Sequence, residues 1–204
     1  MVAFVATILS IAGVRTIAAT SVPSGFSETP VNGTWNDAVG ITFETNGRMW
    51  VWERTGKIWI KDPSDSSPLL LLDIHDEVGA WEDHGMLGFV LDPNFRVNGY
   101  IYLLYIVDRY HLFNFGTPGY DPNANQYNAA TIGRLTRYTC NGGDGFRSVS
   151  LASRLILIGE TRQTGIPVLS YSHGVGSLVF GEDETLLLST GDGATASGVD
   201  QGGG

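Results

Sequence analysis

The feature that most constrains the fold is a loose repeat of one strand unit along the chain. Each copy has a short apolar segment, a turn with Asn-Gly or two acidic residues, and a second apolar strand. Phe43 and Leu91, which mark equivalent positions, are 48 residues apart, and Leu91 and Phe180 are 89 apart, close to two such steps. A period of about 40–50 residues with four strands per unit is typical of β-propeller blades. The three copies span residues 40–53, 88–104 and 177–188.

The first copy shows the local pattern most clearly. Two turn signals, Asn46-Gly47 and Thr55-Gly56, separate three short apolar or alternating segments. Such turns predict an antiparallel meander and exclude a βαβ unit. No stretch between residues 40 and 200 combines a sustained helical period with caps, so we predict an all-β chain. Three tryptophans at strand spacing are expected to pack between blades: Trp50, Trp52 and Trp59.

Composition supports a packed β protein and limits its partners. Of 204 residues, 43% are hydrophobic, 16% are charged and 27 are glycines spread along the whole chain. The formal net charge of −9 argues against nucleic acid and anionic membrane surfaces, because no basic stripe can neutralise phosphates. A neutral or cationic small molecule fits this charge better. The single cysteine, Cys140, allows no internal disulfide and is expected to be a packing residue beside a turn.

The N-terminus resembles a secretory signal peptide. Residues 1–14 are apolar and uncharged, and Arg15 and a run of small residues at 18–21 follow. The segment is short for a transmembrane helix. We therefore predict a signal peptide over residues 1–20 and a secreted or periplasmic protein without a membrane span. A buried first strand or helix is the alternative.

Residues 21–204 are expected to form one domain, a partial β-propeller. Residues 200–204 contain no closing strand, and the length leaves room for about four blades at the repeat period. Propellers protect their edge strands by closing the ring. We therefore expect the first blades of a longer propeller, with an incomplete ring and truncation at the C-terminus. The irregular stretch 111–129 is expected to form a rim or lid loop.

His173 is the strongest candidate for chemistry among the four histidines. It stands at the entrance to a strand, and Gly174 beside it leaves room for a ligand to approach the ring. Imidazole is suited to taking a proton near neutral pH. Asp192 closes the same hairpin-like unit, where a carboxylate could orient the imidazole. The alternative is a structural histidine that hydrogen bonds hold in a loop.

Three blocks of sequence resemble the soluble quinoprotein sugar dehydrogenases that depend on pyrroloquinoline quinone (PQQ), the glucose/sorbosone dehydrogenase family. The block at 173–192 matches the family's histidine, glycine, acidic turn and Gly-Asp without a gap. The block at 83–95 resembles its Gly-Leu-Leu-Gly-Phe run, and 52–58 resembles its early Glu-x-x-Gly-x-Ile turn. The resemblance covers about residues 36–200, with the blocks in the family's order.

The resemblance implies a six-bladed β-propeller oxidoreductase that oxidises a sugar hydroxyl to a lactone. His173 falls on the family's general base, and Asp192 on an aspartate that is expected to support it. Asp83 falls where the family places a Gln or Glu in the pocket for substrate and cofactor. Ser172 stands where the family has an aspartate in some comparisons.

The resemblance also implies cofactors and partners. PQQ would accept the hydride near a Ca²⁺ ion, and an external electron acceptor would reoxidise it. The family's cationic quinone ligands and Ca²⁺ ligands fall beyond this chain, so no metal ligand is assigned within it. We expect the chain to be inactive alone.

Two other functions remain open. Hedgehog-interacting-type proteins are similar in their propeller but bind a protein partner without catalysis, and propeller lactonases hydrolyse through a central Ca²⁺. The presence of both His173 and the Gly191-Asp192 turn favours the dehydrogenase. The lactonase's central ring of acidic and Asn ligands is not evident in the sequence.

The segment around Trp81 is rich in acidic and histidine residues. It lacks EF-hand order and His-x-x-x-His spacing. We therefore expect a solvated rim loop there rather than a metal site. The segment contains Asp73, His75, Asp76, Glu77, Glu82, Asp83 and His84.

Overall fold

The computed structural model describes residues 22–193, so the signal peptide predicted over residues 1–20 lies outside the described residues. The chain forms two compact units, and the boundary between them lies between Val31 and Asn32. Residues 22–31 contain a turn but no helix or strand. All strands described below belong to the second unit, and they form three antiparallel sheets.

The first sheet is a four-stranded meander with the strands in sequence order. The hairpin of β1 and β2 turns at Asn46-Gly47, and Phe43 pairs with Met49 across it. Gly56 has a φ of 95° in the next turn, a conformation that glycine adopts without strain. The meander predicted from the turn signals is therefore confirmed. Its strands are β1 (Ala38–Phe43), β2 (Met49–Glu53), β3 (Lys57–Lys61) and β4 (Leu69–Asp73).

The second sheet contains five strands, of which β8 and β9 both pair with β7. β8 pairs with residues 135–137 of β7 and β9 with residues 131–133, so the two short strands share the outer position of the sheet. The sequence pattern did not predict this division. The strands are β5 (Met86–Leu91), β6 (Tyr100–Ile106), β7 (Thr131–Thr139), β8 (Leu155–Ile158) and β9 (Ile166–Val168).

Short helices interrupt the connections of this sheet. Helix α1 (Phe95–Asn98) joins β5 to β6, and α2 (Arg109–Asn114) follows β6. The expectation that 111–129 is wholly irregular was therefore wrong at its start, because the Asp108 side chain caps α2 by accepting from Tyr110 N. A helix of this length leaves too few turns for a periodic signal. Two 3₁₀ turns lie at Gly142–Asp144 and Leu151–Ser153.

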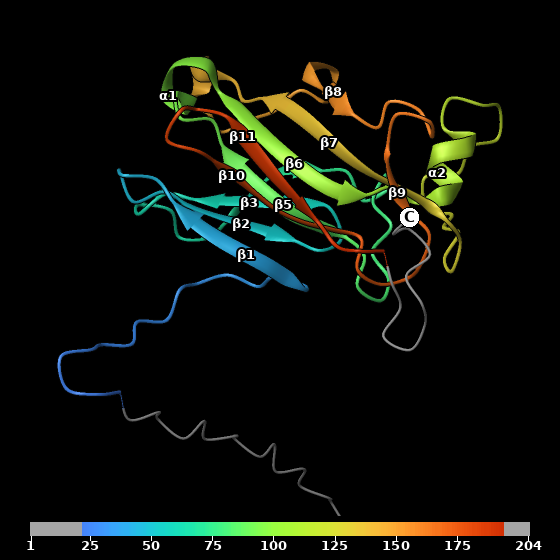
Figure 1. The fold of residues 1–204 in the computed structure, drawn as a ribbon. Helices are drawn as coiled ribbons and strands as arrows, with labels where there is room; N and C mark the ends of the chain where they lie inside the picture. The colour runs from blue at the N-terminus through green and yellow to red at the C-terminus, as the bar shows by residue number, and fades with distance from the viewer. Residues whose placement is uncertain (1–21, 194–204) are drawn as a thin grey trace, which may run out of the picture. The chain divides into compact units, whose positions relative to one another are not determined.

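The third sheet, β10 (Val175–Phe180) and β11 (Leu186–Thr190), packs against β5 and β6. The second sheet thus lies between the first and third. In Figure 1 the hairpin of β10 and β11 runs in front of β5 and β6. Alternate residues of β6 pack against the two neighbouring sheets. Leu103 and Tyr105 belong to the core shared with the first sheet, and Leu104 belongs to the core shared with β10. Successive side chains of a strand point to opposite faces, which explains the unbroken apolar sequence of β6.

Trp50 and Trp52 confirm the packing expected between the first two sheets, whereas the partly buried Trp59 does not belong to this core. Trp50 is fully buried, with ring centroids 5.6 Å from Phe89 and 5.4 Å from Phe95. Trp52 lies 5.2 Å from Phe89. Cys140 is buried in the same core, as expected for a packing residue, and burial raises the pKa of its thiol to about 12.

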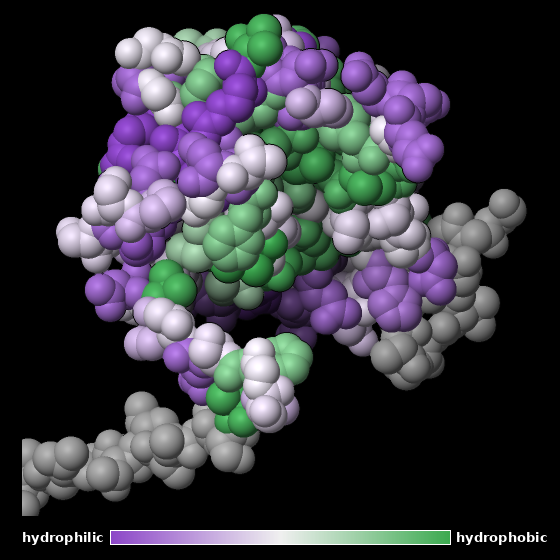
Figure 2. Space-filling view, turned by 90° about the vertical axis from the view of Figure 1, so that its left-hand side faces the viewer, coloured by the Kyte–Doolittle hydropathy of each residue, from purple (hydrophilic) through white to green (hydrophobic). Residues whose placement is uncertain are grey.

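The three sheets are successive blades of a β-propeller, and within the described residues they do not close a ring. The two outermost blades carry exposed apolar side chains on their strands. Figure 2 shows apolar side chains gathered on one side of the molecule. The exposed apolar residues of β1, β10 and β11 are Val39, Ile41, Phe43, Val179 and Leu187.

Candidate active site

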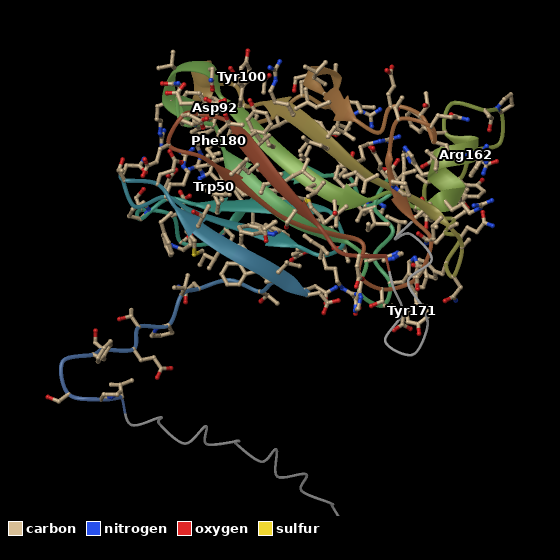
Figure 3. The ribbon with its side chains drawn as sticks, in the orientation of Figure 1. Trp50, Asp92, Tyr100, Arg162, Tyr171 and Phe180 are labelled. Carbon is tan, nitrogen blue, oxygen red and sulfur yellow. The ribbon has the colours of Figure 1, made fainter. Side chains whose placement is uncertain are left out.

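Three connections lie together at one end of the sheets. They are residues 81–85 before β5, residues 169–174 between β9 and β10, and residues 191–193 after β11. Figure 3 shows Tyr171 at this end, while Asp92 and Tyr100 lie at the opposite end near α1. His173 is in the second of these connections.

His173 and Asp192 form a hydrogen-bonded pair. Nδ1 of His173 lies 2.8 Å from Oδ1 of Asp192, and the side chains are 44% and 60% exposed. An ionised carboxylate only accepts hydrogen bonds, so Nδ1 carries the proton in this pair. In the neutral ring Nε2 then keeps its lone pair, and it has no hydrogen-bond partner in the described part of the chain. The pair can therefore accept a proton at Nε2.

The backbone of His173 is held in an unusual conformation. Its φ is 55°, a region that non-glycine residues rarely occupy and that is enriched at functional sites. Gly193 N donates to His173 O at 3.0 Å, and Gly191 N donates to Gly174 O at 2.5 Å. A Cβ at Gly191 would lie 2.2 Å from His173 O, so only glycine permits this approach.

Asp83 reaches the residue before His173. Its Oδ2 accepts a hydrogen bond from Ser172 Oγ at 2.5 Å, although the two residues are far apart in sequence. Ser172 is buried, whereas Asp83 is exposed. Serine at this position thus links the loop of His173 to the loop before β5. The structure brings together the segments that carry the sequence-predicted site residues His173, Asp192 and Asp83.

The sequence does not identify His84 as a site residue, but it contacts the same loop. Its Nε2 lies 2.9 Å from the carbonyl oxygen of Ser170, and the residue is fully buried. Burial lowers the pKa of its imidazole, so the ring is neutral at neutral pH. No sequence signal reveals this contact, because its acceptor is a backbone carbonyl distant in sequence.

The acidic and histidine-rich segment does not form one cluster. Asp73 bonds to His75, the Asp76 carboxylate accepts from Tyr120, and Asp83 and His84 face the loop of His173. No group of three or more metal-ligating side chains occurs among residues 22–193.

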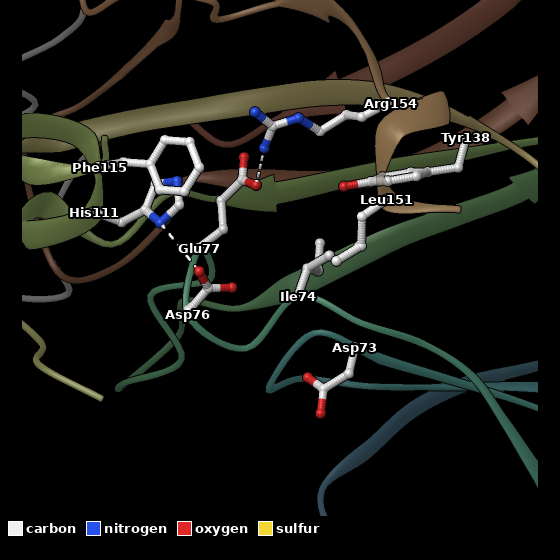
Figure 4. Close-up of a pocket in the computed structure, with 9 residues that line it drawn as sticks. All are labelled: Asp73, Ile74, Asp76, Glu77, His111, Phe115, Tyr138, Leu151 and Arg154. Carbon is white, nitrogen blue, oxygen red and sulfur yellow. Dashed lines mark hydrogen bonds and ion pairs between the residues drawn. The ribbon is translucent and has the colours of Figure 1, made fainter. Parts of the chain in front are cut away.

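Glu77 of that segment lies in a buried charge network. It binds Arg134 at 2.5 Å, Arg154, and the Tyr105 hydroxyl at 2.5 Å. Burial opposes ionisation, but the two arginines and the tyrosine outweigh it and lower the pKa of Glu77. The network borders a cavity of about 190 Å³ (Figure 4) that none of the candidate site residues lines. We interpret it as a structural network.

The described residues around His173 lack the cationic side chains that PQQ requires. PQQ carries carboxylates, which need cationic partners. The acidic Asp83 and Asp192 supply none, and Arg54, which reaches the 81–85 loop by donating to Glu82 O, already pairs with Asp37. The described residues therefore do not form a quinone clamp.

The fold and the site define a β-propeller protein with a histidine–aspartate pair in the loops at one end of its blades. A family model described as Glucose / Sorbosone dehydrogenase matches residues 35–202. The chain therefore belongs to the glucose/sorbosone dehydrogenase family. No curated protein matches the chain in sequence.

Solved structures share the fold at low identity. A glucose dehydrogenase matches with a TM-score of 0.50 and 15% identity, over 77% of this chain and 38% of its own. The PQQ-bound aldose sugar dehydrogenase from Streptomyces coelicolor gives 0.49 and 18%, over 79% and 40%. The apo-form of the soluble aldose sugar dehydrogenase from Escherichia coli gives 0.49 and 20%, over 78% and 38%. The chain thus spans less than half the length of these structures.

No helix within residues 22–193 has the length and apolar character that crossing a bilayer requires.

Proposed function

We propose that this chain supplies the proton-accepting part of a sugar dehydrogenase site, which oxidises an aldose hydroxyl to a lactone. The observation that carries the proposal is the hydrogen bond between His173 Nδ1 and Asp192, which leaves Nε2 available as a base. Membership of the glucose/sorbosone dehydrogenase family supports the substrate class. The apolar N-terminal segment supports export to the periplasm or the exterior.

The proton step follows from the chemistry of the pair. The sugar hydroxyl proton passes to His173 Nε2, which leaves the hydroxyl oxygen with the electron pair of the broken O–H bond. The Asp192 carboxylate stabilises the imidazolium that results. Oδ2 of Asp83 accepts from Ser172 and Oδ1 accepts no bond from described residues, so we assign Oδ1 to a substrate hydroxyl or the cofactor.

The hydride acceptor is proposed from the family resemblance alone. PQQ with Ca²⁺ would supply two-electron acceptor chemistry, and an external acceptor would reoxidise it. Because the described residues do not form a clamp for PQQ, we assign no residue of this chain to its binding.

The test is dye-linked aldose oxidation by the natural protein that carries this sequence, with PQQ and Ca²⁺ added. Loss of the base in His173→Gln is expected to lower kcat by about 100-fold or more. His75→Gln is the matched control, because His75 is exposed and among the described residues it bonds to Asp73 rather than to the site. Equal activity of wild type and His173→Gln would exclude His173 as the base.

A further inference from the structure

The loop that carries His173 is held by two neighbouring residues of another connection. His84 binds the carbonyl oxygen of Ser170 at 2.9 Å, and Asp83 accepts from Ser172 Oγ at 2.5 Å. One residue, Tyr171, separates Ser170 from Ser172, and Ser172 directly precedes His173. The Asp83 backbone N–H also donates to Tyr171 O, at 3.4 Å. These two side-chain bonds and one backbone bond to consecutive residues fix both the position and the direction of this short segment.

His84 is positioned for this contact at a free-energy cost. A carbonyl oxygen only accepts, so Nε2 carries the proton and Nδ1 holds the lone pair. Nδ1 is buried, and in the described part of the chain it has no hydrogen-bond partner. An unpaired buried nitrogen is unfavourable, and an apolar side chain in its place would avoid that cost. The bond to Ser170 O is the polar contact that explains a histidine here.

The surroundings leave the His84 ring little freedom. Trp81 contacts it edge-on, with centroids 4.6 Å apart and the planes at 63°. The ring is fully buried, and burial keeps it neutral by lowering its pKa. A fixed neutral ring offers a single donor in a single direction, which suits a positioning role.

The opposite side of His173 is held by the backbone of Gly191 and Gly193. Hydrogen bonds to the preceding segment and to the two glycines therefore hold His173 in a strained conformation, with a φ of 55°. Release of one side would let its backbone relax and would move the ring away from Asp192.

We propose that Asp83 and His84 form a two-point clamp that positions the His173 ring against Asp192. The clamp rests on the proposed function in one respect: that function makes His173 the base, so the position of its ring matters for activity. His84 acts as a positioning residue through Ser170 and touches neither substrate nor cofactor. Asp83 has two roles: Oδ2 accepts from Ser172 in the clamp, and Oδ1 is assigned to a substrate hydroxyl or the cofactor.

The test compares three His84 and His75 variants of this chain by long-range ¹H–¹⁵N spectra and amide hydrogen exchange. His84→Leu removes the donor and keeps an apolar side chain in the core. His84→Gln keeps an N–H donor at a similar reach from the backbone. His75→Gln replaces an exposed histidine that does not contact the loop.

In wild type we expect the His173 ring to carry its proton on Nδ1. In His84→Leu the ring signals should move toward a mixture of tautomers, and the amides of Gly191 and Gly193 should exchange about tenfold faster. His84→Gln should restore both signals, and His75→Gln should leave them unchanged. A folded His84→Leu variant with the wild-type ring signals and exchange rates would overturn the clamp.

If His84→Leu does not fold, a second variant tests the clamp. Ser172→Ala removes the other point of the clamp and only one oxygen atom. The same change of tautomer and exchange supports the clamp, and wild-type behaviour refutes it. A clamp effect combined with full activity of His173→Gln would leave the clamp intact and refute the proposed function. Inactive His173→Gln with no clamp effect would refute only the clamp.

Discussion

At the scale of single residues, the site depends on how the chain holds His173. The ring is oriented by Asp192, and its backbone adopts a φ of 55° against two glycines. Such a backbone conformation costs on the order of 1–3 kcal/mol, which the surrounding hydrogen bonds must offset. The geometry of the base is thus set by neighbours that would not contact a substrate.

Replacement of Gly191 tests this dependence. In Gly191→Ala the new Cβ would overlap His173 O, so the end of β11 must move away from His173. A displacement of about 1 Å costs roughly 100-fold in rate when it separates reacting groups. We expect kcat of aldose oxidation to fall by that order with little change in melting temperature.

Gly142→Ala is the matched control for that substitution. A Cβ at Gly142 would meet only the Phe146 ring, at 3.5 Å, which is ordinary contact. Its activity should equal that of wild type. Wild-type activity of Gly191→Ala would show that the approach of β11 to His173 is not needed.

At this scale the sequence predicts that His173 and Asp192 lie close together, because a glycine-flanked histidine and a Gly-Asp turn bracket one hairpin. The structure joins the two residues by a hydrogen bond. The contacts of Ser172 and His84 could not be predicted. They link residues that are more than 80 positions apart, and one of them ends on a backbone carbonyl. The roles of these residues stay predictions.

At the scale of elements, strands with clear turn signals were predicted and strands without them were not. β2 and β3 follow Asn46-Gly47 and Thr55-Gly56, and both lie where the pattern placed them. β8 and β9 are short and share one partner strand, so neither shows a full alternation. Helix α2 was missed because its stability comes from the Asp108 cap and tertiary contacts rather than from a periodic face.

The Glu77 network joins the segment after β4 to β7. Glu77→Gln should destabilise the fold by about 3 kcal/mol, because it leaves the charges of Arg134 and Arg154 without a buried counter-ion. Urea unfolding of wild type and variant measures this difference. The exposed Glu160, in the connection after β8, offers a control, and Glu160→Gln should change stability by less than about 0.5 kcal/mol. Equal effects of the two substitutions would contradict a structural role for the network.

At the scale of the whole molecule, stability comes from two apolar cores on either side of the second sheet. The repeat in the sequence predicted this stacking, because each copy supplies the inner strands of one blade. It did not predict which polar groups the blades bury. Two of these, His84 and His111, have pKa values lowered mainly by burial.

These two histidines make stability depend on pH. An unfolded histidine binds a proton near pH 6.5, whereas the folded one stays neutral to lower pH, so the unfolded state takes up more protons in this range. The free energy of unfolding is therefore expected to fall as pH decreases below about 6.5. His84→Gln and His111→Gln should each reduce this slope between about pH 7 and 5. An unchanged slope in these two variants would contradict the assignment.

The central claim is that Nε2 of His173 is available to accept a proton because Asp192 holds the proton of Nδ1. The most direct measurement is a long-range ¹H–¹⁵N spectrum of this chain at neutral pH, with His173→Gln used to assign the signals. We predict that His173 carries its proton on Nδ1 and that Asp192→Ala removes this preference. A His173 ring protonated on Nε2 in wild type, or unaffected by Asp192→Ala, would contradict the claim.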